Sequence, residues 1–305
     1  MAATTALTGS ALYGDLAAFV ADECRGDSAI AAVLGPYDDA RIGDMVPLRF
    51  FGALHRLVLE RRAPALGVFY PSVGGTAPES EVARRACREA LRATVAEHAP
   101  DIAAHLAWFP QTNEVGRTAA LLAVLRDVGA AWGLPVRLHE IGCSAGLSLR
   151  VDALAESGVV LPERPDTGPV PSIVERIGCD TAPIDPTTTD GRLLLTSFIW
   201  PDQEERLERL RGAFAAAEAV PATVIAEDAL ELIEVDYALL PGVAYLEDAI
   251  APDAPLLFEE AGSNIAQERQ FKYGDPDAAF ASAAHTFRYD YRFPRSIATP
   301  METFG

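Results

Sequence analysis

Lysine is almost absent from this sequence. Lys272 is the only one, and the 25 Lys and Arg residues stand against 44 Asp and Glu residues, which gives a formal net charge of −19. A surface that binds nucleic-acid phosphates needs clustered basic side chains, and no such cluster is found. We therefore expect no nucleic-acid partner. The same charge balance disfavours an anionic membrane surface.

Cysteine is also scarce, and long apolar runs are missing. Cys24, Cys87, Cys143 and Cys179 lie far apart, without the C-x-x-C or Cys/His spacing of a metal site,. We read them as reduced thiols in a reducing compartment and expect no bound metal. No stretch approaches the roughly 18–20 apolar residues of a membrane span, and the N-terminus lacks a basic region ahead of an apolar run. A cytoplasmic bacterial protein is the expectation.

The order of the predicted elements indicates an α/β fold. Residues 1–132 show helical spacing of apolar side chains, and Gly133–Pro135 ends that pattern,. Short apolar runs at 136–141, 173–177 and 222–226 then alternate with helical segments. Strands that alternate with helices are typical of a parallel, doubly wound sheet. We expect a helical N-terminal section, 1–132, followed by a truncated Rossmann-like domain.

The alternation stops after residue 227. Residues 286–293 instead alternate aromatic and polar side chains, which is typical of a half-buried antiparallel strand,. The expected domains are therefore 1–132, 133–227 for the Rossmann-like part, and 228–305 for a fragment of α+β type.

The turn after the first strand carries the main functional signal. The strand ends in Glu140 and is followed by G-x-S-x-G and a helix, which places backbone N–H groups and a helix N-terminus around a small space,. One chemistry that uses such a turn is binding of S-adenosylmethionine (SAM), with acidic residues at the ends of the next strands holding the ribose and adenine. The candidate cofactor-binding residues are Glu140, Gly142, Ser144, Gly146, Asp180 and Asp228.

Two other interpretations of the turn stay open. G-x-S-x-G between a strand and a helix is also the context of a serine nucleophile, and Ser144, Asp180 or Asp228, and His285 follow the Ser–Asp–His order,. A hydrolase would however need several strands before Ser144. The third interpretation is a tight turn without any ligand. A nicotinamide cofactor is less favoured, because Ser144 replaces the middle glycine of G-x-G-x-x-G.

An unusually polar helix start precedes the first strand. We expect Asn113 to cap a helix with Glu114 in its first turn,. Capping and a role in facing a substrate are equally compatible with these residues. Arg117 completes the polar group.

From about residue 48 to 226 the sequence resembles a bacterial family known as domain of unknown function 2332. The matching stretches are FGALHRLVLERRAPAL, YPSVGG, QTNEVGRTAALL, LHEIGCSAGLSLR, ERIGCDTAPIDP and IWPDQEERLERLRGAF. The resemblance implies a class I SAM-dependent methyltransferase fold with a helical N-terminal extension and an unknown acceptor. It also implies that Glu140–Gly146 is the ligand turn and that Asn113, Glu114 and Arg117 face the pocket. It supplies no catalytic residue.

From about residue 226 onward the sequence is similar to a different family, the molybdopterin-binding large subunit of carbon monoxide, xanthine and aldehyde-oxidising enzymes. This similarity is carried by the segment ALELIEVDYALLPGVAYLEDAIAPDAPLLFEEAGSNIAQERQFKYGDPDAAFASAAHTFRYDYRFPRSIATPMETFG. In that family the pterin-binding loops follow later, so we expect no molybdopterin here. The sequence thus predicts a chimera that binds a small molecule. Its methyltransferase-like activity is expected to be impaired, and a non-catalytic remnant without a ligand is the alternative.

Overall fold

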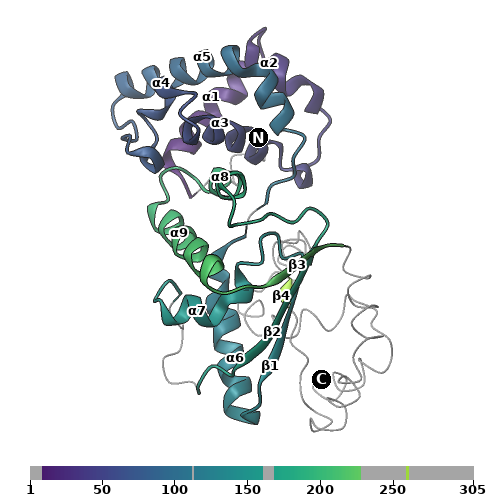
Figure 1. Cartoon of the computed structure of the whole chain (residues 1–305). Coiled ribbons are helices and arrows are strands. Elements are labelled where there is room, and N and C mark those ends of the chain that lie inside the picture. The colour runs from purple at the N-terminus through teal and green to yellow at the C-terminus, as the bar shows by residue number, and fades with distance from the viewer. Residues whose placement is uncertain (1–8, 112, 161–167, 228–258, 261–305) are drawn as a thin grey trace, which may run out of the picture. The chain divides into compact units, whose positions relative to one another are not determined.

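The computed structural model describes residues 9–111, 113–160, 168–227 and 259–260, and it shows helices followed by a parallel sheet (Figure 1). The predicted α/β class is therefore confirmed. The chain forms two compact units. The first comprises residues 1–116, 156–160 and 185–219, and the second comprises residues 117–155, 161–184 and 220–305. The domain boundaries expected from the sequence stay a prediction.

The first unit is helical. Its longer helices are α1 (Ala11–Glu23), α3 (Val46–Leu59), α5 (Glu81–His105), α8 (Thr189–Ser197) and α9 (Glu204–Ala219). Shorter turns of helix connect them, namely α2 (Ala29–Leu34), η2 (Gly35–Tyr37), η3 (Ile42–Asp44), α4 (Pro64–Gly67), η4 (Pro71–Val73) and η5 (Val115–Arg117, whose last residue opens the second unit). Ser10, Ser28, Ser80 and Thr188 cap α1, α2, α5 and α8 with their hydroxyl oxygens,.

An aromatic cluster forms the centre of this unit. The rings of Tyr13 and Phe51 stack with centroids 4.5 Å apart, and Trp200 approaches Tyr13 edge-on at 5.1 Å. Tyr70 packs on the same ring at 6.1 Å. Burial of each such side chain is worth about 1.5–3 kcal/mol, so the cluster ties α1 and α3 to the chain that leads into α9.

His55 joins three segments of the same unit. Its Nδ1 lies 3.2 Å from the carbonyl oxygen of Ser197 at the end of α8, and its Nε2 lies 2.8 Å from Ser72 Oγ in η4. Because a carbonyl only accepts, Nδ1 carries the proton and Nε2 accepts from the serine hydroxyl. Complete burial lowers the pKa of His55 to about 4, so the ring is neutral at pH 7,.

The second unit holds the sheet. It contains α6 (Thr118–Trp132), η6 (Ser148–Arg150), most of α7 (Val151–Glu156), and the strands β1 (Val136–Ile141), β2 (Ile173–Asp180), β3 (Thr223–Ala226) and β4 (Glu259–Glu260). All pairings are parallel and the order is β3-β2-β1-β4. Figure 1 shows α6 and α7 beside these strands on the same side.

Local sequence signals explain where these elements begin and end. Gly133 caps the C-terminal end of α6 with a left-handed φ of 62°, as a glycine after a helix commonly does,. Leu138 is buried within β1, and Ile141 packs with Cys179 of β2 in the small sheet core. The predicted bounds of β1 are confirmed, whereas β2 runs further than predicted, to Asp180.

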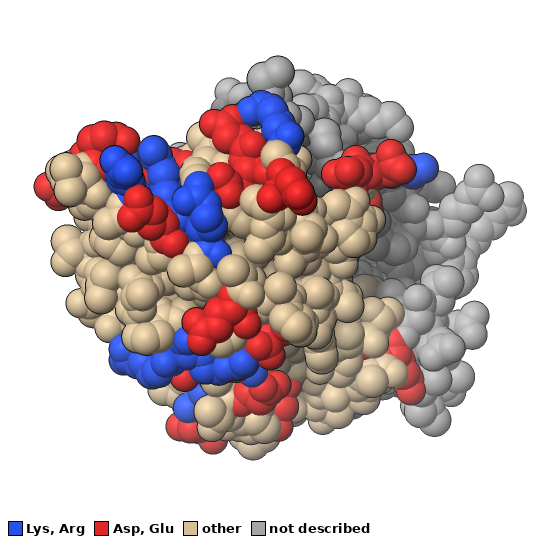
Figure 2. Space-filling model, turned by 90° about the horizontal axis from the view of Figure 1, so that it is seen from above, with Lys and Arg blue, Asp and Glu red and all other residues tan. Residues whose placement is uncertain are grey.

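The predicted α+β fragment, 228–305, lies outside the described residues except for the two residues of β4. Within the part of the chain that is described, no helix combines the length and the apolar character that a membrane crossing needs. Acidic and basic side chains lie interspersed on the face drawn in Figure 2. The ion pairs of α5 include Arg88 with Asp15 and Arg92 with Glu23.

Candidate functional site

In the turn after β1, every second residue from 142 to 146 has a positive φ angle. The φ angles of Gly142, Ser144 and Gly146 are 65°, 53° and 61°. Glycine adopts this left-handed region freely, whereas for an L residue it costs roughly 1–2 kcal/mol. The three positions are those of G-x-G-x-G, and a serine occupies the middle one at that cost.

Asp180 contacts this turn directly. It is the last residue of β2, which runs parallel to β1, so the two carboxyl ends meet at one edge of the sheet. Its Oδ2 accepts the backbone N–H of Ser144 at 2.8 Å, and its Oδ1 accepts the N–H of Ala182 at 2.8 Å. The carbonyl of Ser144 in turn accepts from the N–H of Ile184 at 3.0 Å. The segment after β2 therefore holds the turn from both sides of Ser144.

Two glycines at this edge are needed for packing. A Cβ on Gly146 would lie 2.9 Å from Cγ2 of Val224 in β3, and one on Gly178 would lie 2.6 Å from Sγ of Cys143. Both distances are below those that real Cβ atoms show, so side chains are excluded at these positions. Gly146 therefore allows the turn to pack closely on β3.

Cys143 and Glu140 are buried beside the turn. Burial raises the pKa of the Cys143 thiol, and the nearby Glu140 and Asp180 raise it further. The thiol is therefore protonated at neutral pH and is no nucleophile. Glu140 is 1% exposed, and its backbone pairs with Gly178 on one side and Glu259 on the other. The candidate Glu140 thus lies on the central strand that leads into the turn.

Arg150 was missed by the sequence analysis. Its buried guanidinium donates from Nη1 to the carbonyl of Gly146 at 2.5 Å and from Nε to the carbonyl of Val220 at 3.0 Å. It therefore fastens the turn to the segment that enters β3. The signal available in the sequence was an arginine within the apolar run Leu147–Val151.

The hydroxyl of Ser144 is buried. The residue is 5% exposed, and among the residues that the structure describes its Oγ has no hydrogen-bond partner. No imidazole therefore bonds to it within the described ranges, and the carboxylate of Asp180 contacts its backbone N–H instead. His285 and Asp228, which the sequence analysis named as further candidates, lie outside the described residues.

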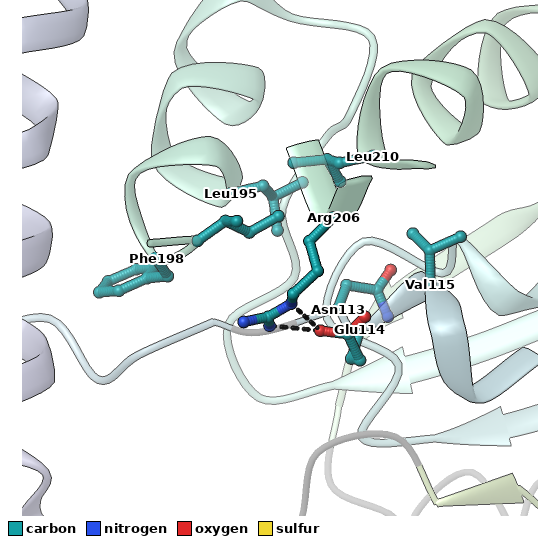
Figure 3. A pocket seen from close by; sticks show the side chains of 8 residues that line it. Asn113, Glu114, Val115, Leu195, Phe198, Arg206 and Leu210 are labelled. Atoms are coloured by element: carbon teal, nitrogen blue, oxygen red, sulfur yellow. Dashed lines mark hydrogen bonds and ion pairs between the residues drawn. The ribbon is translucent and has the colours of Figure 1, made fainter. Parts of the chain in front are cut away.

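Asn113 and Glu114 line a second feature, in the first unit. Glu114 Oε2 accepts from Nε of Arg206 in α9 at 2.8 Å, and its Oε1 accepts the N–H of Gly116 at 3.2 Å (Figure 3). Arg206 also donates to Gln203 at 2.5 Å. The cavity that these residues line measures only about 10 Å³, at the lower limit for holding one water molecule,. Glu114 is thus committed to an ion pair with α9, which sequence reasoning did not foresee.

The predicted helix cap at Asn113 is wrong. The helix α6 begins at Thr118 after the short turn η5, and Arg117 occupies its cap position without a side-chain cap bond. Asn113 is buried ahead of these elements. Arg117 is exposed and belongs to the second unit, whereas Asn113 and Glu114 belong to the first. The structure therefore brings Asn113 and Glu114 together, and their role toward a substrate stays a prediction.

Comparison with protein families gives one long match. Residues 1–245 match the family described as "Uncharacterized protein conserved in bacteria (DUF2332)". The match confirms the resemblance predicted for residues 48–226 and extends beyond it at both ends. No solved structure matches the chain significantly.

Comparison with curated proteins gives partial matches of another kind. The chain is 38% identical over 112 residues to a "Probable xanthine dehydrogenase" subunit of Bacillus subtilis, covering 35% of this chain and 15% of that protein. It is 38% identical over 78 residues to "6-hydroxypseudooxynicotine dehydrogenase complex subunit gamma" of Paenarthrobacter nicotinovorans, covering 26% and 10%. It is 36% identical over 94 residues to "Carbon monoxide dehydrogenase large chain" of Hydrogenophaga pseudoflava, covering 27% and 12%. The chain thus spans only a small part of these relatives.

Proposed function

This chain belongs to the bacterial DUF2332 family, and we propose that it binds S-adenosylmethionine at the turn Gly142–Gly146 as a methyltransferase-like protein with a small-molecule acceptor. The observation that carries the proposal is the place of this turn in the sheet. The turn follows the carboxyl end of β1, where Asp180 at the carboxyl end of the parallel strand β2 contacts it. In open parallel sheets, ligands bind outside the carboxyl ends of the strands.

The residues of the turn fit an adenosine-bearing cofactor. In nucleotide-binding turns the first glycine allows the tight bend, the second allows a ligand to approach the backbone, and the third allows close packing on the sheet. Gly142 and Gly146 have the positive φ angles for the first and third roles, and the packing of Gly146 on Val224 agrees with the third. Ser144 occupies the approach position with a buried hydroxyl that has no partner among the described residues.

Asp180 is the proposed ribose ligand. A carboxylate offers about four lone-pair sites, and the two backbone N–H groups that Asp180 binds use one on each oxygen,. Each oxygen therefore keeps capacity for a ribose hydroxyl. Glu140 and Asp228 are proposed as the other acidic positions. When bound, SAM would supply an electrophilic methyl group, and the residues named here would hold and orient it.

Binding of S-adenosylhomocysteine to the full chain tests this proposal by isothermal titration calorimetry. We expect a saturable binding heat that Asp180→Asn weakens at least tenfold, because asparagine has one accepting oxygen where Asp180 has two, so a ribose hydroxyl or a backbone N–H of the turn loses its acceptor,. Glu175→Gln is the matched control, since Glu175 lies earlier on the same strand and pairs with Arg137 at 3.5 Å. A titration without heat supports the alternative that the protein is a non-catalytic remnant without a ligand. An unaltered affinity of Asp180→Asn contradicts the role of Asp180 as the ribose ligand.

The serine hydrolase is the second candidate, and the backbone of Ser144 favours it. A positive φ on a strand-to-helix turn is the setting in which hydrolases present their nucleophile,. The variant Ser144→Gly separates the two candidates, because it retains the backbone that a nucleotide turn uses and removes the hydroxyl that a hydrolase needs. Labelling of the wild type, but not of Ser144→Gly, by a fluorophosphonate probe would favour the hydrolase.

We also propose that the C-terminal part, from about residue 226, has a separate ancestry and impairs the activity. The partial similarity to dehydrogenase subunits supports this proposal. The family match ends at residue 245 and leaves 60 residues at the C-terminal end. The dehydrogenase match of 78 residues is longer than this remainder and must therefore overlap the family match. Sequencing of the gene across codons 220–232 tests whether the reading frame is continuous there. Methylation of a substrate at ordinary turnover would contradict the impairment.

A further inference from the structure

A cavity in the helical unit has a built polar wall. It measures about 250 Å³ and lies among α3, α5 and α8, with an apolar side formed by Ala53, Leu57 and Leu194. This volume approaches that of small-molecule sites, which range from about 300 to 1,000 Å³. The helix α5 is kinked at His98, two residues before Pro100, and the residues after the kink contribute Asp101 and His105 to the cavity,.

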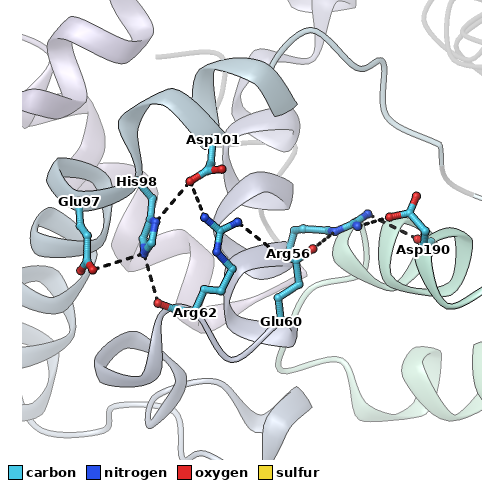
Figure 4. Close-up of polar contacts among 7 residues, drawn as sticks. All are labelled: Arg56, Glu60, Arg62, Glu97, His98, Asp101 and Asp190. Carbon is cyan, nitrogen blue, oxygen red and sulfur yellow. Dashed lines mark hydrogen bonds and ion pairs between the residues drawn. The ribbon is translucent and has the colours of Figure 1, made fainter.

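The arginines of the cavity are already engaged by carboxylates. Arg56 donates from Nε to Glu60 at 2.7 Å and pairs with Asp190 through its Nη2 (Figure 4). Arg62 donates to Asp101 at 2.6 Å and also lies 3.5 Å from Glu60. Three carboxylates therefore face two guanidinium groups, and the wall carries a net charge of −1.

His105 does not change this balance at neutral pH. Burial, followed by the charge of Arg56, lowers its pKa to about 4, so the ring is neutral. Its Nε2 is buried and has no hydrogen-bond partner among the described residues. The Arg62 guanidinium lowers the pKa of Asp101, which His98 also contacts at 3.4 Å, so this carboxylate stays ionised. The cavity thus offers excess negative charge.

Trp108 adds an aromatic surface. It lines the cavity and is 56% exposed, an unusual state for a tryptophan,. The face of an indole ring is the best aromatic partner for a cation. Phe109, the next residue, is 50% exposed and does not line the cavity.

We propose that this cavity binds a small organic cation, an ammonium or guanidinium group carried on an apolar body. The cationic group would neutralise the excess carboxylate charge and contact Trp108, and the body would lie against the apolar side. A simple anion is disfavoured, because the arginine donors of the wall are used by Glu60, Asp101 and Asp190. Binding of such a cation does not depend on the turn at Gly142–Gly146.

Titration of the full chain with 2-phenylethylamine tests the proposal, with 2-phenylethanol as the neutral analogue of the same shape. We expect the amine to bind at least tenfold more tightly than the alcohol at low salt, and its affinity to fall as ionic strength rises. Equal affinity of the two compounds, or no binding of the amine up to about 10 mM, would overturn the proposal.

Two substitutions locate the site. Trp108→Ala is expected to weaken amine binding about fivefold, the equivalent of one cation–π contact, whereas Phe109→Ala is the exposed control and should leave it unchanged. Asp190→Asn is expected to weaken binding as well, and its 79% exposed side chain makes a folding defect easy to exclude by circular dichroism. If Trp108→Ala binds the amine as tightly as the wild type and the Phe109→Ala control do, the cavity is not the site and the proposal fails.

Discussion

Replacement of Ser144 by glycine should stabilise the sheet unit. The φ of 53° costs an L residue roughly 1–2 kcal/mol, and glycine removes that cost,. Glycine also makes the unfolded chain more flexible, which offsets about 0.5–1 kcal/mol. The buried hydroxyl has no partner among the described residues, and its removal relieves a desolvation cost of about 1–3 kcal/mol,. The net expectation is a gain of about 1–4 kcal/mol.

Hydrogen exchange of peptides from β1 and β2 measures this effect, because it reads the stability of the sheet unit separately from the helical unit. Ser144→Ala should gain less than Ser144→Gly, since alanine removes the hydroxyl but keeps the strained φ. A loss of stability in Ser144→Gly would refute the reasoning, because it would mean that the hydroxyl or the Cβ makes a contact that holds the turn.

Two glycine variants calibrate the size of the backbone contribution. Gly133 has a φ of 62°, and a Cβ added there would have no atom closer than 4.0 Å. Gly133→Ala should therefore lower the stability only by the backbone strain, about 1 kcal/mol. Gly146→Ala has a similar φ, but its Cβ would lie 2.9 Å from Val224, so it should cost clearly more, about 2–4 kcal/mol,. Equal losses in the two variants would contradict the close packing described for the turn.

Two further predictions concern the helical unit and the sheet core. The pKa of His55 is about 4 in the folded chain and 6.5 in the unfolded chain, so the unfolded chain takes up the proton first,. The contribution of His55 to stability is complete well above pH 6.5 and falls by about 3 kcal/mol as the pH drops to 4, and His105, whose pKa is also about 4, adds a similar loss,. Urea titrations at several pH values should show this fall, and His55→Gln should reduce it by about half. Gly178→Ala forces a Cβ to 2.6 Å from Cys143 Sγ, so its thermal midpoint should fall by several degrees relative to the wild type, and an unchanged midpoint would show that β1 and β2 separate easily,.

Only part of the candidate site could be predicted from the sequence. The glycines of the turn and the strand that precedes them follow from local patterns, and the alternating backbone at positions 142, 144 and 146 agrees with them. Asp180 was predicted from its place at the end of the next strand, and the structure places its carboxylate on the N–H of Ser144. The ion pair between Glu114 and Arg206 could not be predicted, because the two residues are 92 positions apart and meet only through the packing of α9.

The sequence alone determined the features that depend on neighbouring residues. The bounds of β1, the end of α6 at Gly133 and the tight turn after Ile141 result from alternating apolar residues and from glycine and proline, which act within a few positions. The tertiary structure decided which of these segments meet. The parallel register brings Asp180 to the turn, and the packing of α3, α5 and α8 encloses the acidic cavity around Arg56. Such contacts depend on the burial of apolar faces that lie far apart in the chain, and no local pattern encodes them.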